Sequence, residues 1–236
     1  MEADMRRLMT ILAALTATST AFAQADAGTG SYDDFVPTTE LSTGTENPPD
    51  TALVRRLFTL AFTEPCNAAI DGGYGGTEPR VFDLEYEGSY DEPGAPAHKF
   101  RLYQFNCNGG AYNFSSVFYG WDEIDGLQPL SLASPSTKPS YDEAAGDGDG
   151  KLIKLELTGM TASFLVTNAD VDDKSGTIAA TAYWRGIGDA SSIGVWSLSD
   201  GEYRLVSYDV DASYDGELNP IRVFDRSEPE DIALPN

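Results

Sequence analysis

Short segments in which apolar and polar residues alternate recur along the chain after about residue 80, and they constrain its fold more than any other feature. They are rich in aromatic and β-branched residues and are separated by clusters of Gly, Asp and Ser. This pattern is typical of strands joined by short turns. The segments span residues 80–86, 99–105, 112–121, 151–157, 162–168, 177–184, 193–199, 202–210 and 220–224. About nine such strands predict a mainly β fold, either an antiparallel β-sandwich or a partly open barrel.

One helix is predicted ahead of these strands. Asp50 is a candidate N-cap, and apolar residues follow it at helical spacing, which predicts a single short helix over about residues 51–62. Residues 24–49 are rich in Gly, Ser, Thr, Pro and acids, and we expect them to be disordered. The sequence therefore predicts one domain over residues 50–225, followed by an acidic tail over residues 226–236.

The N-terminus has the three parts of a secretory signal. Arg6 and Arg7 precede an apolar run that is too short to span a bilayer, and the run ends with Ala21 and Ala23 at the A-x-A positions. We expect residues 1–23 to be cleaved and the product to be periplasmic or secreted, with no membrane span left after cleavage.

The chain has two cysteines, Cys66 and Cys107, which allow a single disulfide. In an exported protein we expect them to be oxidised, and this conflicts with a role for either one as a nucleophile. Gly109 and Gly110 follow Cys107 directly, and we expect them to let the chain turn before the next strand.

The net charge is −23, and the segments before residue 51 and after residue 224 account for only part of it, leaving −14 on residues 51–224. An acidic field of this size disfavours nucleic acid and anionic membranes, and it attracts cations and basic proteins. An acidic proteome in a salty habitat explains the same charge, so the composition alone does not identify a partner.

One interpretation of two acidic segments is a calcium site that does not have the EF-hand geometry. If residues 151–157 and 162–168 pair as a hairpin, residues 145–150 and 168–176 lie at the same end of the sheet. The first of these segments resembles an EF-hand loop but has Ala145 at its first position and no flanking helices, which excludes a true EF-hand. The alternative is that the Asp-Gly pairs form solvated turns. The candidate ligands are Asp147, Asp149, Asp170, Asp172 and Asp173.

No catalytic cluster stands out in the sequence. His98 is the only histidine, no G-x-S-x-G elbow is present, and a zinc site built on several histidines is excluded. Carboxylate pairs could be formed from many residues, so no particular pair is specific. The three tryptophans, Trp121, Trp184 and Trp196, lie within or at the ends of predicted strands, where they would serve either as a glycan or peptide platform or as sheet packing.

Two stretches of the chain resemble a bacterial envelope family known as domain of unknown function family 1176. That family has a Cys-x-x-Gly-Ala-Tyr-Asn-x-Ser element and, much later, an Arg-Gly-x-Gly-Asp-Cys-Gly element followed by a Trp-containing strand. The resemblance covers roughly residues 99–224 and implies an exported, mainly β domain, with no activity attached. The matching residues are Gly110, Ala111, Tyr112, Asn113 and Ser115, then Arg185, Gly186, Gly188, Asp189 and Trp196.

The chain departs from that family pattern in a paired way. Ala190 stands where the family has Cys, and residues 211–216 lack the Cys that the family has after its last long strand. Strand direction predicts that loops 185–192 and 211–219 lie at the same end of the sheet. Loss of both cysteines together is what a deleted disulfide would leave, and it argues against cysteine chemistry at this place.

The features together favour a non-catalytic exported domain that binds a basic protein or an envelope component, with no cofactor other than the candidate calcium ion. A carboxylate-dependent hydrolase is the first alternative. An inhibitor of basic cell-wall lysozymes is the second, because an acidic domain attracts small basic enzymes.

Overall fold

The computed structural model describes residues 46–142 and 150–226. The predicted signal over residues 1–23, almost all of the lead-in over 24–49 and the tail beyond Arg226 lie outside the described residues, as do Asp147 and Asp149. Within the described part, the helices are α2 (Thr51–Ala61) and α3 (Asn67–Ile70). The strands are β1 (Arg80–Tyr86), β2 (His98–Gly109), β3 (Phe114–Asp122), β4 (Gly126–Leu130), β5 (Leu132–Tyr141), β6 (Leu152–Ser163), β7 (Val166–Thr167), β8 (Ala169–Val171), β9 (Ile178–Tyr183), β10 (Ser191–Ser199), β11 (Glu202–Asp211) and β12 (Ile221–Asp225).

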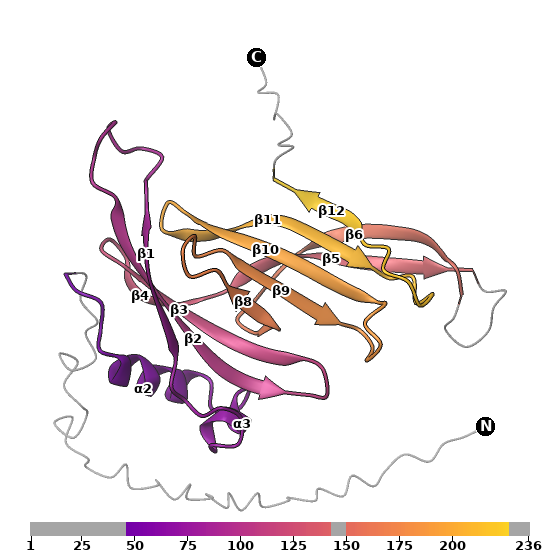
Figure 1. Ribbon diagram of the computed structural model, residues 1–236, viewed down its shortest axis with the longest axis horizontal. Coiled ribbons are helices and arrows are strands. Elements are labelled where there is room, and N and C mark those ends of the chain that lie inside the picture. The colour runs from indigo at the N-terminus through magenta and orange to yellow at the C-terminus, as the bar shows by residue number, and fades with distance from the viewer. Residues whose placement is uncertain (1–45, 143–149, 227–236) are drawn as a thin grey trace, which may run out of the picture. The chain divides into compact units, whose positions relative to one another are not determined.

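The strands form two antiparallel sheets and a separate hairpin (Figure 1). The first sheet has the order β1-β2-β3-β4, with β7 paired to the start of β3. The second has the order β12-β11-β10-β9-β8, and β5 and β6 form the hairpin. Neither sheet closes on itself. The predicted mainly β antiparallel sandwich with a short helix is therefore confirmed, and the barrel alternative is not.

Both faces of β2 and β3 are buried, which makes the first sheet the middle layer of three. Phe100, Leu102 and Phe118 belong to a core cluster that also contains residues of the second sheet. Tyr103 and Phe105 point the other way, into a second cluster formed with α2. Period-two alternation in a strand with two covered faces produces two separate cores.

Helix α2 begins where the sequence predicts. The Asp50 carboxylate accepts a hydrogen bond from the backbone N–H of Ala52 at 2.8 Å, and such an N-cap stabilises a helix by about 1 kcal/mol. Val54 and Phe58 are fully buried on the inner side of the helix. The Phe58 ring stacks on Phe105 of β2 with ring centroids 4.4 Å apart, so the helix is fixed to the first sheet.

The hairpin predicted from residues 151–157 and 162–168 is wrong. Strand β6 runs without interruption from Leu152 to Ser163 and pairs with β5, a strand that the sequence analysis missed. Gly159 lies at a β-bulge within β6 rather than in a turn, because the pairing register shifts by one residue beside it. Pro135 and Pro139 concealed β5, since proline within a segment argues against a central strand.

Candidate functional site

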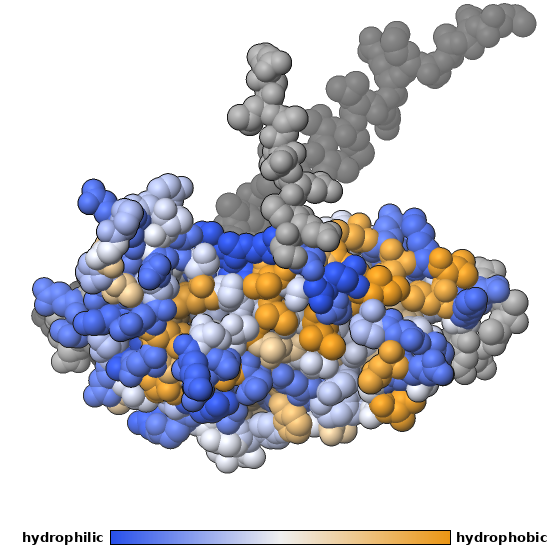
Figure 2. Space-filling view, turned by 45° about the horizontal axis from the view of Figure 1, so that its top comes forward, coloured by the Kyte–Doolittle hydropathy of each residue, from blue (hydrophilic) through white to orange (hydrophobic). Residues whose placement is uncertain are grey.

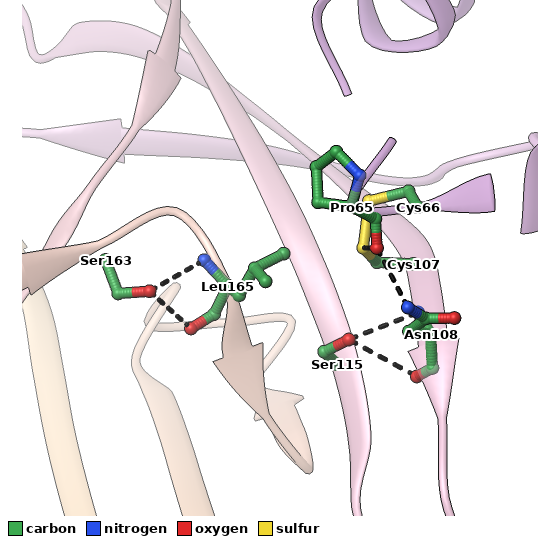
Figure 3. The surroundings of a disulfide bond; sticks show 7 residues. All are labelled: Pro65, Cys66, Cys107, Asn108, Ser115, Ser163 and Leu165. Atoms are coloured by element: carbon green, nitrogen blue, oxygen red, sulfur yellow. Dashed lines mark hydrogen bonds between the residues drawn. A yellow bond between two sulfur atoms is a disulfide. The ribbon is translucent and has the colours of Figure 1, made fainter. Parts of the chain in front are cut away.

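The disulfide between Cys66 and Cys107 is present as predicted and joins the start of α3 to the end of β2 (Figure 3). Both cysteines are fully buried. The side chain of Asn108 donates a hydrogen bond to the carbonyl oxygen of Pro65 at 2.9 Å, so the same two segments are also joined beside the sulfur atoms. Within the described residues no free cysteine is present, which excludes a thiol nucleophile there.

The two glycines after Cys107 do not act as predicted. Neither Gly109 nor Gly110 has a positive φ angle, so the turn does not depend on their conformational freedom. Gly109 is required for another reason: a Cβ atom there would lie 2.0 Å from the ring of Tyr74. The Tyr74 ring, from the segment before β1, lies over the end of β2 and stacks near Phe114 with centroids 5.4 Å apart.

Asn113 connects the β2–β3 turn to the end of β9. Its side-chain nitrogen donates to the carbonyl oxygen of Tyr183 at 2.7 Å, and its side-chain oxygen accepts from the Tyr183 backbone N–H at 3.1 Å. The amide thus forms the two hydrogen bonds that a neighbouring strand residue would form. Since these bonds go to backbone groups, Asn113 holds β9 against the first sheet.

Asn168 is the second residue of this connection, and the sequence analysis missed it. Its side-chain nitrogen donates to Asn113 Oδ1 at 3.0 Å and to the carbonyl oxygen of Thr181 at 2.9 Å, and its Oδ1 accepts from the Phe114 N–H at 2.8 Å. Its φ angle is 47°, in the left-handed region that asparagine adopts more readily than most residues. One side chain therefore joins β3, β9 and the segment between β7 and β8.

The second element that resembles the family, residues 185–189, is bonded to the loop after β11. Arg185 is ion-paired with the buried carboxylate of Asp189 and donates to the carbonyl oxygen of Tyr214 at 2.7 Å. Asp189 also accepts from the backbone N–H of Gly216 at 2.8 Å. The hydrogen bond from Arg185 lowers the pKa of the Asp189 carboxyl to about 2. The predicted meeting of loops 185–192 and 211–219 is therefore confirmed by direct contacts.

The two elements that carry the family resemblance also touch each other. A Cβ atom at Gly186 would lie 3.4 Å from the Tyr112 ring, so the ring packs against the Gly186 backbone. Gly188 has a φ angle of 80°, which favours glycine there. Gly110 and Ala111 form the exposed turn between β2 and β3.

Ser115 and Trp196, the remaining residues that match the family pattern, form hydrogen bonds within the fold. The Ser115 hydroxyl accepts from the Asn108 backbone N–H at 3.1 Å, next to a register shift between β2 and β3. Trp196 is buried in the core, and its Nε1 donates to the carbonyl oxygen of Ala133 in β5 at 2.7 Å. Trp121 is buried as well, which leaves only Trp184 partly accessible among the three tryptophans.

These contacts leave a group of exposed apolar side chains around one place. We name the group of Tyr112, Phe114, Tyr183 and Ile187 the aromatic end. Figure 1 shows the turn between β2 and β3 close to the loop that follows β9, where these residues lie. Ile187 is 73% exposed, and the three aromatic residues are also exposed. The aromatic end is the candidate functional site.

The predicted calcium ligands are not brought together by the described residues. Asp172 accepts from the backbone N–H and the hydroxyl group of Ser175 and from the backbone N–H of Lys174, and these bonds lower the pKa of its carboxyl as they close its own turn. Asp170 lies on β8, and Asp173 is exposed. Within the described residues no group of three His, Cys, Asp or Glu side chains could hold a metal ion. Since Asp147 and Asp149 lie outside that part, calcium binding stays a prediction, without the hairpin that motivated it.

His98 forms a pair with a carboxylate. Its Nε2 lies 3.2 Å from Asp91 Oδ1, and the ring stacks on Tyr86 with centroids 5.1 Å apart. The hydrogen bond with His98 is the main reason that the pKa of the Asp91 carboxyl is lowered. No hydroxyl group in the described part of the chain hydrogen-bonds this ring. The pair therefore lacks the nucleophile that a Ser-His-Asp triad needs.

No known family model, characterised protein or solved structure matches the chain. The resemblance to domain of unknown function family 1176 thus rests on the two short elements alone. Among the described residues, no helix is both long enough and apolar enough to cross a membrane. The fold and the site define a disulfide-linked antiparallel β domain with an exposed aromatic end.

Proposed function

We propose that the chain is a non-catalytic binding module of an oxidising compartment, either periplasmic or secreted, and that the aromatic end contacts its partner. The observation that supports the proposal is a set of hydrogen bonds, which we call the frame, that holds the backbone beneath the exposed side chains in place. Asn113 and Asn168 bond to backbone groups on both sides, and Arg185 and Asp189 fix the neighbouring loops. Apolar side chains on such a frame lose little conformational entropy on binding, which favours affinity.

A basic protein or an envelope component is the partner that the charge favours. Asp215 and Glu217 are exposed in the loop that Arg185 holds. The Arg185 charge is balanced by Asp189, so this region adds no net positive charge. An acidic surface around apolar side chains speeds association with a positively charged protein and makes it dependent on salt. A basic cell-wall lysozyme is one defined protein with this chemistry.

The experiment compares a variant at the aromatic end with a control variant elsewhere on the surface, and each of them replaces one exposed tyrosine with serine. Tyr112→Ser with Ile187→Ser removes exposed apolar surface at the aromatic end. Tyr90→Ser is the matched control, because Tyr90 is 99% exposed in the loop between β1 and β2. The purified chains are immobilised and exposed to an envelope fraction, and separately to a basic lysozyme, at low and high salt.

We expect salt-sensitive capture of a basic protein by the parent chain and by Tyr90→Ser. The variant at the aromatic end should lose at least tenfold in affinity, since truncation of central apolar residues in an interface costs about 1–3 kcal/mol. Equal capture by both variants would show that the aromatic end is not the binding surface. Inhibition of the lysozyme by the parent chain would identify the inhibitor alternative, and capture without inhibition would leave binding alone.

A further inference from the structure

Strand β6 has one paired edge, and its other edge has no partner strand among the described residues; we name it the open edge. It pairs with β5 from Leu152 to Ser163, and no other strand among the described residues pairs with it. Its open edge presents backbone N–H and C=O groups that a further strand could bond. Ile153, Leu157 and Met160 are 66%, 52% and 51% exposed. Figure 1 places β6 and β12 in the right half of the molecule. In the same half, Figure 2 shows several hydrophobic side chains at the surface.

The two edges of the hairpin differ in how they are protected. Strand β5 contains Pro135 and Pro139, which have no N–H to donate to a neighbouring strand. Strand β6 contains no proline. Proline on an edge is a common way to prevent strand addition. The hairpin therefore accepts a new strand on the β6 side only.

We infer that the open edge of β6 pairs with β6 of a second copy of this chain, antiparallel and around a two-fold axis at Leu155. In this register Lys154 lies opposite Glu156 of the second copy, and Ile153 lies opposite Leu157 of the second copy. Opposite charges and apolar pairs directly across an antiparallel ladder stabilise it. In one chain Lys154 Nζ already lies 2.9 Å from Glu156 Oε2, so pairing produces four charges that alternate in sign.

The charge distribution favours this contact between two otherwise repelling molecules. The whole chain has a net charge of −23, but strands β5 and β6 together carry two lysines and one glutamate, a net charge of +1. These residues are Lys138, Lys154 and Glu156. Contact through the hairpin keeps the acidic surfaces of the two copies apart, where repulsion is screened by salt.

Strand pairing through β6 also ends at two copies. The resulting sheet has the order β5-β6-β6-β5, and both of its outer strands contain Pro135 and Pro139. A two-fold contact uses the same surface on both copies and closes on itself. Two copies therefore form a complete assembly, because the edges left at the outside of this sheet belong to the proline-containing strand β5.

Charge reversals in β6 test the register directly. The purified chain, with whatever processing its host applies, is examined by sedimentation equilibrium over a range of concentrations. Lys154→Glu places like charges opposite each other twice in the dimer, and Glu156→Lys does the same with the opposite sign. We expect each variant alone to weaken dimerisation about tenfold, because two favourable cross-strand pairs become unfavourable.

An equal mixture of the two variants restores both opposite-charge pairs between the copies, so a heterodimer should form at least as tightly as the parent dimer. Lys174→Glu is the control, since it changes the net charge equally at an exposed position in the turn between β8 and β9. It should leave dimerisation unchanged. A parent chain that stays monomeric at every concentration would overturn the inference. So would a dimer that survives both variants, or a mixture that forms no heterodimer.

Discussion

Removal of the disulfide is the change whose effect on stability follows most directly from the structure. Cys66 and Cys107 are 41 residues apart in the chain, and a cross-link that closes a loop of this length stabilises the folded state by about 4 kcal/mol in the chain-entropy treatment. Both sulfur atoms are buried in the cluster that α2 forms with the first sheet. Cys66→Ala with Cys107→Ala therefore also leaves unfilled space, which adds about 1–2 kcal/mol.

The two contributions can be separated by treating the parent chain with reductant. Reduction releases the constraint but keeps the sulfur atoms, so the free energy of unfolding should fall by about 4 kcal/mol. The double alanine variant should lose about 5–6 kcal/mol, which is a large part of the 5–15 kcal/mol that holds a typical domain folded. Since only the parent contains a disulfide, the variant should not respond to reductant.

Urea unfolding followed by tryptophan fluorescence measures these differences, because Trp121 and Trp196 are buried and become exposed on unfolding. The dependence of the unfolding free energy on urea should become steeper without the cross-link, since the unfolded chain exposes more surface. A variant within about 1 kcal/mol of the oxidised parent would refute the loop-closure argument. An unchanged urea dependence would place the effect in the folded state instead.

Three further changes test the contacts around the aromatic end. Asn113→Ala leaves two backbone groups of Tyr183 without their partner, and we expect a loss of about 2 kcal/mol in urea unfolding; a loss within error would contradict the bridging role. The lowered pKa of Asp189 stabilises the folded chain above the unfolded pKa of about 4 and is lost as the pH falls towards 2, so Asp189→Asn should flatten this part of an acid titration of stability, and an unchanged acid dependence would count against it. Ala190→Cys with Ala212→Cys should form a second disulfide worth about 3 kcal/mol, because both residues are buried and adjoin the first pair of the β10–β11 register; two titratable thiols in the denatured, unreduced variant would exclude it.

Strands with alternating burial are the part of the fold that could be predicted from the sequence. The segment over residues 80–86 matches β1 residue for residue, and the segment over 202–210 falls one residue short of β11. Both lie between clear turn signals, and packing agrees with their local preference. The sequence prediction was wrong for β5 and β6, where local residue preferences indicate turns or loops but pairing with a distant segment produces a strand. Gly159 resembles a turn residue but lies in a bulge, and β5 contains two prolines although it is a strand, because among the described strands it pairs with β6 alone and is therefore an edge strand.

The candidate site was predictable only in part, for a related reason. Strand direction was enough to place loops 185–192 and 211–219 together, since consecutive antiparallel strands return to the same end. It gave no sign of Asn168, whose role depends on three segments meeting in space. Its left-handed conformation is a signal that the sequence does not display. Tyr74 was hidden in the same way, since only the glycine opposite its ring makes room for it.

The two proposals make a joint prediction that neither makes alone. Two copies joined through β6 carry two aromatic ends, so binding to a surface that displays many partner molecules gains from effective concentration. On a densely coated surface, Lys154→Glu should therefore dissociate faster than the parent, and on a sparsely coated surface the two should dissociate alike. Tyr112→Ser with Ile187→Ser should weaken binding on both surfaces, because it changes the contact itself. Biosensor measurements at two densities of the captured basic partner distinguish these patterns. Equal dissociation of Lys154→Glu and the parent on the dense surface would show that pairing through β6 does not contribute to binding.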